Sequence, residues 1–313
     1  MILSNKNNDI KKIAIVCGGT TSEREVSLNS SSSIKAALDT IGYEAVLLDW
    51  PESSVVDNSD ELKKFDLVFI GYHGGPGESG LIQATLELAG IPYTGSAALA
   101  CGISMDKIYS KRIFDQMEIP TPRWFAWEEK KAPSAKVVLN SSRLVFPIVV
   151  KTPNQGSTIG ITIAKNSSEL DVGIQAALAY EHRILFEEYI PGREVTSAIL
   201  EGEQLPVVEI IPKDGFYDYK HKYTSGASEY VCPADISDEI AKRITDIGNR
   251  AFKALDLRHY GRVDFRLDGD MPYCLEVNSL PGMTSFSLVP KAAASVGITF
   301  TELLNRIINM AVG

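Results

Sequence analysis

The fold is decided by residues 261–285, which read GRVDFRLDGDMPYCLEVNSLPGMTS. Residues 263–267 and 273–278 alternate apolar and polar side chains, as strands with one buried face do. The Asp-Gly-Asp sequence between them is typical of a turn, so we predict two paired strands in a hairpin. On the second strand Glu276 and Asn278 are two residues apart, so their side chains share a face.

Three oxygen-bearing side chains meet on that face if the first strand presents Asp264 to it. Magnesium prefers oxygen ligands, and proteins usually hold it through one or two carboxylates together with substrate phosphates. The hairpin therefore predicts a metal site that works with a nucleotide. The alternative is a solvated polar face on an edge hairpin, which is the commoner cause of such alternation. We favour the metal site because Arg262 and a Pro-Gly turn, not Lys and Thr, accompany these residues.

The composition predicts a globular protein with two or three cores. The chain has 313 residues, of which 44% are apolar and 23% charged. Its net charge of −9 argues against nucleic acid or an anionic membrane as a partner. No apolar run approaches a membrane span, and the polar N-terminal segment lacks a signal-peptide core, so we expect a cytoplasmic protein. The widely spaced cysteines are expected to be reduced thiols: Cys17, Cys101, Cys232 and Cys274.

The first third of the chain alternates strands with helices. We predict strands at 13–16, 45–48 and 67–70 and helices at 27–38 and 81–88, which together indicate a parallel sheet covered on both faces. A dinucleotide-dependent oxidoreductase is an alternative, because a glycine turn follows the first strand. The turn reads GGTTSE from Gly18, however, and this lacks the GxGxxG spacing of a dinucleotide site.

The middle of the chain contains a candidate phosphate site. After a predicted helix at 105–117, the strand 146–151 ends in Lys151 and leads into a Gly/Ser loop before the strand 161–164. An ammonium group beside such a loop can bind phosphate, although a lysine that reaches solvent before a hairpin turn is the alternative. A further strand at 184–190 ends in acidic residues, which can offer backbone hydrogen bonds to adenine and a carboxylate to ribose.

A series of ordered motifs joins these segments. They are Gly18-Gly19-Thr20, Glu23-Arg24-Glu25-Val26-Ser27, His73-Gly74-Gly75-Pro76-Gly77-Glu78, Tyr93-Thr94-Gly95-Ser96, Ser104-Met105-Asp106-Lys107, Gly156-Ser157, Phe216-Tyr217-Asp218-Tyr219, Gly261-Arg262-Val263-Asp264, Glu276-Val277-Asn278 and Pro281-Gly282-Met283-Thr284. In this order they resemble the D-alanine–D-alanine ligase family of the ATP-grasp superfamily, from about Ile13 to the C-terminal helix. One departure is Ser79, where the family usually has Asp, and it puts the local hydrogen bonding around His73 in doubt.

The resemblance implies an α/β protein with the ATP-grasp fold and three domains. These are a parallel α/β domain at 1–96, a central domain with the Gly/Ser loop at 97–187, and a C-terminal domain with the metal site at 188–313. It implies an ATP-dependent ligase that joins two D-alanine molecules through an acyl phosphate, for peptidoglycan precursors. ATP and two Mg²⁺ or Mn²⁺ ions are the implied cofactors, and a homodimer is the implied assembly.

The resemblance also assigns residues, each by its match to a family motif. The nucleotide is assigned to Lys107, Lys151, Glu187, Glu188, Tyr189, Ile190, Glu194 and Lys222, and the metal ions to Asp264, Glu276 and Asn278. The D-alanine molecules and the reaction are assigned to Glu23, His73, Ser157, Tyr223, Arg262, Gly282, Ser287 and Leu288. Within this set, Ser157 and Tyr223 match residues that hydrogen-bond to Glu23 and latch two loops over the site.

Several of these residues have a plainer interpretation. Glu23 follows Thr-Thr-Ser and could be a helix-capping acid, whereas the family match makes it the ligand of the first alanine's ammonium group. Arg262 could form an ion pair with Asp264, which is compatible with stabilising an anionic intermediate. His73 could be structural.

Three other functions remain as alternatives to dipeptide synthesis. They are a ligase that joins D-alanine to D-lactate or another D-amino acid, a nucleotide-binding regulator without turnover, and the oxidoreductase. The intact set of lysines, Arg262 and metal ligands argues against the regulator.

Overall fold

The first lobe forms around an unbroken apolar strand, residues 13–16, whose side chains are fully buried. A strand that is apolar on both faces suits the centre of a covered parallel sheet. The computed structural model describes residues 10–156, 160–201, 203–213, 228–284 and 287–313, and there the sheet order is β2-β1-β3, all parallel. The lobe contains β1 (Lys12–Gly18), α1 (Arg24–Thr40), β2 (Glu44–Trp50), α2 (Ser53–Asp57), α3 (Ser59–Leu62), β3 (Leu67–Ile70), α4 (Gly75–Glu78) and α5 (Leu81–Ala89).

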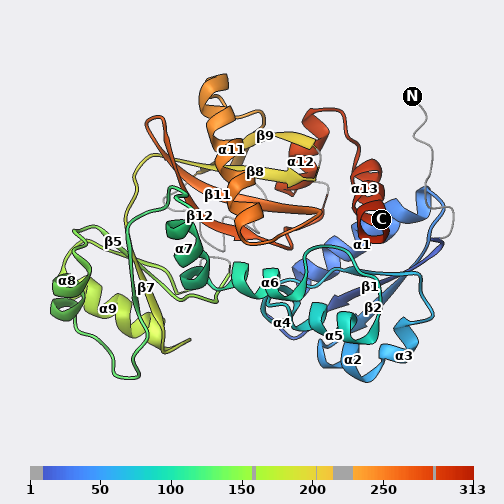
Figure 1. Ribbon diagram of the computed structural model, residues 1–313, viewed down its shortest axis with the longest axis horizontal. Helices are drawn as coiled ribbons and strands as arrows, with labels where there is room; N and C mark the ends of the chain where they lie inside the picture. Colours follow the sequence, from blue (N-terminus) through green and yellow to red (C-terminus); the bar gives the residue numbers. More distant parts are fainter. Residues whose placement is uncertain (1–9, 157–159, 202, 214–227, 285–286) are drawn as a thin grey trace.

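The central lobe is an antiparallel sheet with two helices on it (Figure 1). Its strand order is β4-β7-β5-β6, and the buried side chains of β5 and β7 share a core with those of α8 and α9. The elements are β4 (Trp124–Trp127), α8 (Ala135–Ser142), β5 (Ile148–Lys151), β6 (Thr162–Ala164), α9 (Ser167–Leu178) and β7 (Ile184–Glu188). The strands predicted at 146–151, 161–164 and 184–190 are present, and each is one to two residues shorter.

The C-terminal lobe contains the predicted hairpin, formed by β11 and β12. Its antiparallel sheet has the order β10-β9-β8-β11-β12, and α11 packs Ile244, Ile247 and Ala251 into the same core as Phe265. The elements are β8 (Arg193–Leu200), β9 (Glu203–Pro212), β10 (Ser228–Val231), α11 (Asp238–Ala254), β11 (Tyr260–Asp268), β12 (Met271–Asn278), α12 (Leu288–Ser295) and α13 (Phe300–Val312).

The hairpin contains a β-bulge that the alternating pattern does not predict. Asp264 lies opposite Glu276, but its neighbour Phe265 lies opposite Cys274, so Leu275 is an extra residue on β12. Cys274 and Val277 are three residues apart and both are buried in the core, which a regular strand cannot achieve. The bulge therefore lets β12 bury both residues and still place Glu276 beside Asp264.

The helix predicted at 105–117 is present as α7 (Lys107–Gln116), and it is preceded by a helix that was not predicted, α6 (Ala98–Met105). The chain breaks at Asp106, which has extended backbone angles and caps α7. Ala100 of α6 and Phe114 of α7 belong to the core cluster of the C-terminal lobe. The domain boundaries predicted at 96 and 187 stay a prediction.

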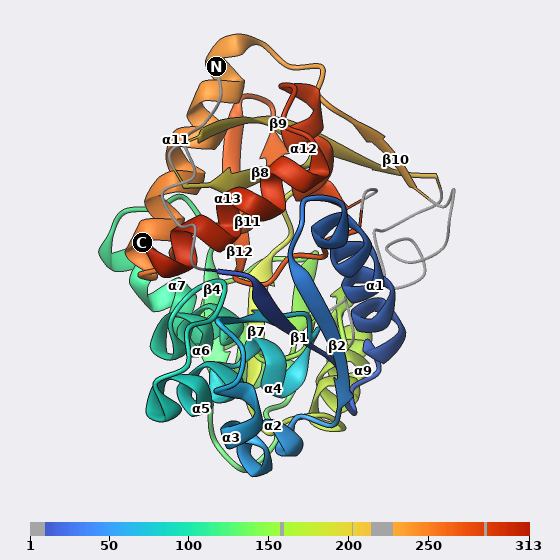
Figure 2. The ribbon, with the colours of Figure 1, turned by 90° about the vertical axis from the view of Figure 1, so that its right-hand side faces the viewer.

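The end of the chain returns to the first lobe (Figures 1 and 2). Leu304 and Ile308 of α13 are fully buried in the same core cluster as β1, and Tyr43 donates a hydrogen bond of 2.8 Å to Asn305. The first and third lobes are therefore packed as one body. Among the described residues, we find no helix with the length and apolar character that a membrane crossing needs.

Two glycines allow a test of how tightly this part of the fold is packed. Gly42 and Gly80 have φ values of +91° and +90°, but a Cβ on Gly80 would lie 2.2 Å from the Ala98 carbonyl oxygen, whereas a Cβ on Gly42 meets nothing within 4 Å. We expect Gly42→Ala to lower the free energy of unfolding by about 1–2 kcal/mol, because alanine is strained in the left-handed backbone conformation. Gly80→Ala should lower it clearly more, because the backbone at Ala98 also has to move.

Thermal unfolding of the two variants measures this difference. Equal shifts in Tm would contradict the close contact between the α4–α5 turn and the start of α6.

Candidate active site

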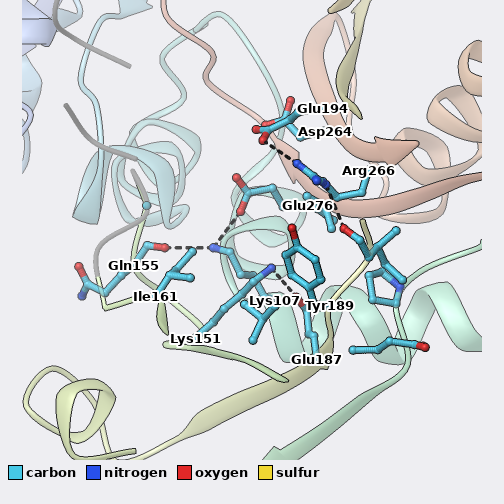
Figure 3. Close-up of a pocket in the computed structure, with 16 residues that line it drawn as sticks. Lys107, Lys151, Gln155, Ile161, Glu187, Tyr189, Glu194, Asp264, Arg266 and Glu276 are labelled. Carbon is cyan, nitrogen blue, oxygen red and sulfur yellow. Dashed lines mark hydrogen bonds and ion pairs between the residues drawn. The ribbon is translucent and has the colours of Figure 1, made fainter. Parts of the chain in front are cut away.

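A pocket of about 770 Å³, part of it open to solvent, lies between the central and C-terminal lobes (Figure 3). Residues from α7, the segment before β4, β5, the β5–β6 connection, β7 with the segment after it, β8, β11 and β12 line it: Lys107, Pro122, Val149, Lys151, Gln155, Gly156, Ile161, Glu187, Glu188, Tyr189, Ile190, Glu194, Asp264, Arg266, Leu275 and Glu276. The pocket thus brings together most of the residues that the resemblance assigns to the nucleotide and two of those assigned to metal.

Lys107 enters the pocket from the first turn of α7. The Asp106 carboxylate accepts the N–H groups of Ile108 and Tyr109 at 3.0 and 3.3 Å and so fixes where the helix begins. The Lys107 ammonium donates to the Gln155 carbonyl oxygen at 3.0 Å and lies 3.1 Å from the Glu276 carboxylate. One cation thus joins three segments of the pocket (Figure 3).

Lys151 forms an ion pair with Glu187 on the neighbouring strand. Val149 lies opposite Glu187 in the β5–β7 pairing, which makes Lys151 the diagonal neighbour of Glu187 on the same face. The other Glu187 oxygen lies 2.6 Å from the ammonium group of Lys111. Burial by itself raises the pKa of Glu187, but the two lysines outweigh burial and hold that pKa below its ordinary value.

Asp264 is surrounded by hydrogen-bond donors. Arg262 donates to both of its oxygens at 2.8 Å, and Thr196 donates to one at 2.7 Å. The ion-pair interpretation of Arg262 therefore describes its contact in this structure. Asn278 lies opposite Arg262 in the hairpin, and its side-chain oxygen accepts the Leu280 N–H at 2.9 Å. Among the described residues, no cluster of three His, Cys, Asp or Glu side chains forms a metal site by itself.

The segment assigned to adenine and ribose is held by arginines. Arg266 donates to the carbonyl oxygens of Ile190 and Gly192 at 3.2 and 2.7 Å and lies 3.6 Å from the Glu194 carboxylate. Arg123 makes two hydrogen bonds to Glu188, at 2.9 and 3.0 Å. The N–H groups of Glu188 and Tyr189 donate to the backbone oxygens of Arg123 and Pro147, so these two N–H groups are engaged within the protein.

Glu23 stands immediately before α1 but does not cap it. Its side chain makes no capping hydrogen bond, although the residue occupies the N-cap position. A Cβ on Gly74 would lie 2.4 Å from the Glu23 carboxylate, and a Cβ on Gly156, which lines the pocket, would lie 3.8 Å from it. The carboxylate therefore points across Gly74 toward the pocket, and the capping interpretation does not account for it.

His73 is buried beside the same loop. Its ring nitrogens lie 3.3 Å from the Ser30 hydroxyl and 3.7 Å from the Glu78 carboxylate, and its backbone oxygen accepts a hydrogen bond from Thr21. The Ser79 hydroxyl is buried and finds no hydrogen-bond partner among the described residues. The contacts of His73 therefore do not involve Ser79.

Gly282, Ser287 and Leu288 come together at the start of α12. The Ser287 hydroxyl accepts the Thr284 N–H at 3.0 Å, and a Cβ on Gly282 would lie 3.1 Å from that hydroxyl. Leu288 is buried. Glycine at 282 thus leaves space beside the Ser287 hydroxyl.

Three assigned residues, Ser157, Lys222 and Tyr223, lie outside the described residues. Lys111 and Arg266 are two charged residues of the site that were not predicted, and each had a signal in the sequence. Lys111 follows Lys107 by four residues, which on a helix means the same face. Arg266 follows Asp264 by two residues, which on a strand means the same face.

Comparison with known proteins identifies the family to which this chain belongs. Residues 50–96 match the family described as D-ala D-ala ligase N-terminus, and residues 113–309 match D-ala D-ala ligase C-terminus. The D-alanine–D-alanine ligase of Moorella thermoacetica is 41% identical over 309 residues, which cover 96% of this chain and 99% of that protein. That of a Synechococcus species is 44% identical over 303 residues, covering 96% and 93%.

Solved structures agree with the sequence relatives. The D-alanine–D-alanine ligase of Bacillus anthracis complexed with ATP has a TM-score of 0.84 and 33% identity, with 97% of each chain covered. A D-Ala:D-Ser ligase from Enterococcus faecalis has a TM-score of 0.83 and 29% identity, covering 96% of this chain and 99% of that one. The predicted ATP-grasp fold is confirmed, and the chain belongs to the D-alanine–D-alanine ligase family.

Proposed function

We propose that this protein is an ATP-dependent ligase that joins two D-alanine molecules to D-alanyl-D-alanine for peptidoglycan precursors. The observation that carries the proposal is the pocket in which Lys107 and Lys151 face the paired carboxylates Asp264 and Glu276, in a chain of this family. Cations and acidic ligands side by side are what phosphoryl transfer needs, because its transition state spreads charge over oxygens.

ATP occupies this pocket in our proposal. Lys107 and Lys151 bind the phosphates, residues 187–190 contact the adenine, and Glu194 binds the ribose. Lys222 is proposed as a further nucleotide contact. Support comes from the buried ammonium groups of the two lysines, which lie in the pocket wall beside the β7 segment.

The acidic residues of the pocket fit a divalent metal. Asp264 and Glu276 supply one carboxylate each, and Asn278 supplies an amide oxygen on the same strand as Glu276. Two carboxylates without a complete protein cage suit Mg²⁺, which completes its coordination with water and substrate phosphates, and Mn²⁺ accepts the same ligands. We propose two ions per site, whose chemistry is to neutralise phosphate charge during transfer.

In the first step, Glu23 binds the ammonium group of the first D-alanine. A carboxylate oxygen of that alanine attacks the γ-phosphorus of ATP, an O–P bond forms, and the bond to the β-phosphate oxygen breaks to release ADP. Support comes from the Glu23 carboxylate, which points across Gly74 toward Gly156 of the pocket. Ser157 and Tyr223 are proposed to hold Glu23 in this position.

In the second step, the amine of the second D-alanine attacks the acyl phosphate carbonyl. The C–N bond forms, the C–O bond to phosphate breaks, and the proton that the amine gives up ends on the departing phosphate. Arg262 and the Gly282 N–H stabilise the anionic tetrahedral intermediate. Ser287 binds the carboxylate of the second alanine, with Leu288 and His73 beside it, and the space next to the Ser287 hydroxyl supports this placement.

The second substrate is the part of the proposal with a specific rival, since one structural relative is a D-Ala:D-Ser ligase. D-Alanine is favoured because the D-alanine–D-alanine ligases reach 41–44% identity and that relative reaches 29%. We also propose that the protein acts in the cytoplasm as a homodimer, which light scattering of the purified protein tests.

Phosphate release from ATP and Mg²⁺ tests the reaction. Release should require D-alanine and should not occur with L-alanine, and the product should be the dipeptide even when D-serine and D-lactate compete at equal concentration. D-Alanine-independent release, or D-alanyl-D-serine or depsipeptide as the main product, would refute the assignment.

Loss of one carboxylate charge should disable the metal site. We expect Asp264→Asn and Glu276→Gln each to lower turnover by more than about 100-fold, since even groups that only support a metal ligand contribute about 10–100-fold. Circular dichroism should report an unchanged fold. Asp268→Asn is the matched control, because Asp268 is exposed on the same strand and should keep normal turnover. Near-normal turnover in either pocket variant would remove the metal assignment.

The Glu23→Gln variant tests whether Glu23 binds the first D-alanine or only stabilises the fold. Because the side chain does not cap α1, Tm should change little. The KM for the first D-alanine should rise by about tenfold or more, the usual scale for a lost charge-assisted hydrogen bond. Glu25→Gln, an exposed acid in the first turn of the same helix, serves as the control. A lower Tm with unchanged kinetics would return Glu23 to a structural role.

A further inference from the structure

Lys111 is a lysine with no exposed surface, and the proposed reaction gives it no role. Burying an ammonium group is costly unless it is paired and hydrogen-bonded. Its nitrogen lies 2.6 Å from the Glu187 carboxylate and donates at 2.6 Å to the Thr121 hydroxyl. Thr121 in turn donates to the Cys274 carbonyl oxygen at 2.7 Å, so Lys111 of α7 is held between β7 and β12.

Glu187 therefore has two cations, one on each oxygen. Lys111 forms an ion pair with one oxygen of Glu187. Lys151, which lines the pocket, forms an ion pair with the other oxygen. Glu187 is only 1% exposed, so both ion pairs are shielded from bulk water in this structure. The cluster contains two positive charges and one negative charge, and its net positive charge favours a phosphate in the pocket.

The arrangement has a consequence for Lys151. If Lys151 were the sole partner of Glu187, its movement toward a phosphate would leave a buried carboxylate unpaired, and losing one partner of a buried ion pair is strongly destabilising. Lys111 removes this free-energy penalty, because it remains paired with Glu187 when Lys151 moves. Burial lowers the pKa of Lys111, against the effect of Glu187, so the charge of Lys111 depends in turn on that carboxylate.

We propose that Lys111 is a positioning residue that serves as the permanent counter-ion of Glu187 and so releases Lys151 for the nucleotide phosphates. The proposal rests on the proposed function, because it takes the pocket to be a nucleotide site. The competing explanation is that Lys111 only holds α7 against its neighbours.

Calorimetric titration with Mg²⁺–ADP and with adenosine tests the proposal on the full-length protein. Adenosine lacks phosphates, so the ratio of the two Kd values isolates the phosphate interaction from effects on the base. We expect Lys111→Met to weaken ADP relative to adenosine by about tenfold, the scale of coupling between contacting groups. Arg112→Met, at the exposed next position of α7, is the matched control and should leave the ratio unchanged.

A double-mutant cycle separates positioning from a structural role. In Glu187→Gln no carboxylate competes for Lys151, so adding Lys111→Met should leave the ADP-to-adenosine ratio unchanged. If Lys111→Met alone does not fold, comparing Glu187→Gln with the double variant Glu187→Gln/Lys111→Met still tests the proposal. The double variant should fold, because replacing both partners of a buried ion pair often leaves stability unchanged.

Three outcomes overturn the proposal. They are equal weakening of ADP and adenosine in Lys111→Met, an unchanged ratio in that variant, and a loss that persists in the Glu187→Gln background. In all three the unmodified protein still binds ADP. Failure of the unmodified protein to bind ADP would instead refute the proposed function together with this inference.

Discussion

The constraint on which the structure depends is charge balance among the largely buried charged side chains of the pocket. Carboxylates there have to be paired, because an isolated buried charge is far too costly. Each pocket carboxylate accordingly has a cation beside it: Glu276 has Lys107, Glu187 has Lys151 and Lys111, Glu188 has Arg123, Asp264 has Arg262, and Glu194 has Arg266. The pairs formed by α7 also tie the central lobe to the C-terminal lobe.

These pairs suit a site that alternates between an empty and a loaded state. In the proposed function, a cation that balances a carboxylate would turn to a phosphate oxygen, and a metal ion would take its place on the carboxylate. Arg262 and Asp264 illustrate this, since the guanidinium group now covers both oxygens that a metal would use. The charged side chains are thus held in place by their partners before any ligand arrives, which is the preorganisation that electrostatic catalysis requires.

Much of the fold and of the site could be predicted from residue patterns. The buried run at 13–16 indicated a central parallel strand, the alternation at 263–267 indicated the hairpin, and the ordered motifs indicated the family. The bulge at Leu275 could not be predicted, because local alternation does not reveal that Cys274 and Val277 both reach one core. Helix α6 was missed because it is short, contains Gly102 and has no side-chain cap at its start, whereas α7 begins within two residues of the helix predicted at 105–117.

The sequence by itself determined which residues carry charge and on which face of a strand or helix they lie, since these follow from periods of two and 3.6 residues. Only the tertiary structure decided which charges pair. Lys107 meets Glu276, and Lys111 meets Glu187, because α7 packs between β7 and β12, and those contacts join segments far apart in the chain. Pairing of this kind depends on how separate elements pack, and no local pattern contains that information.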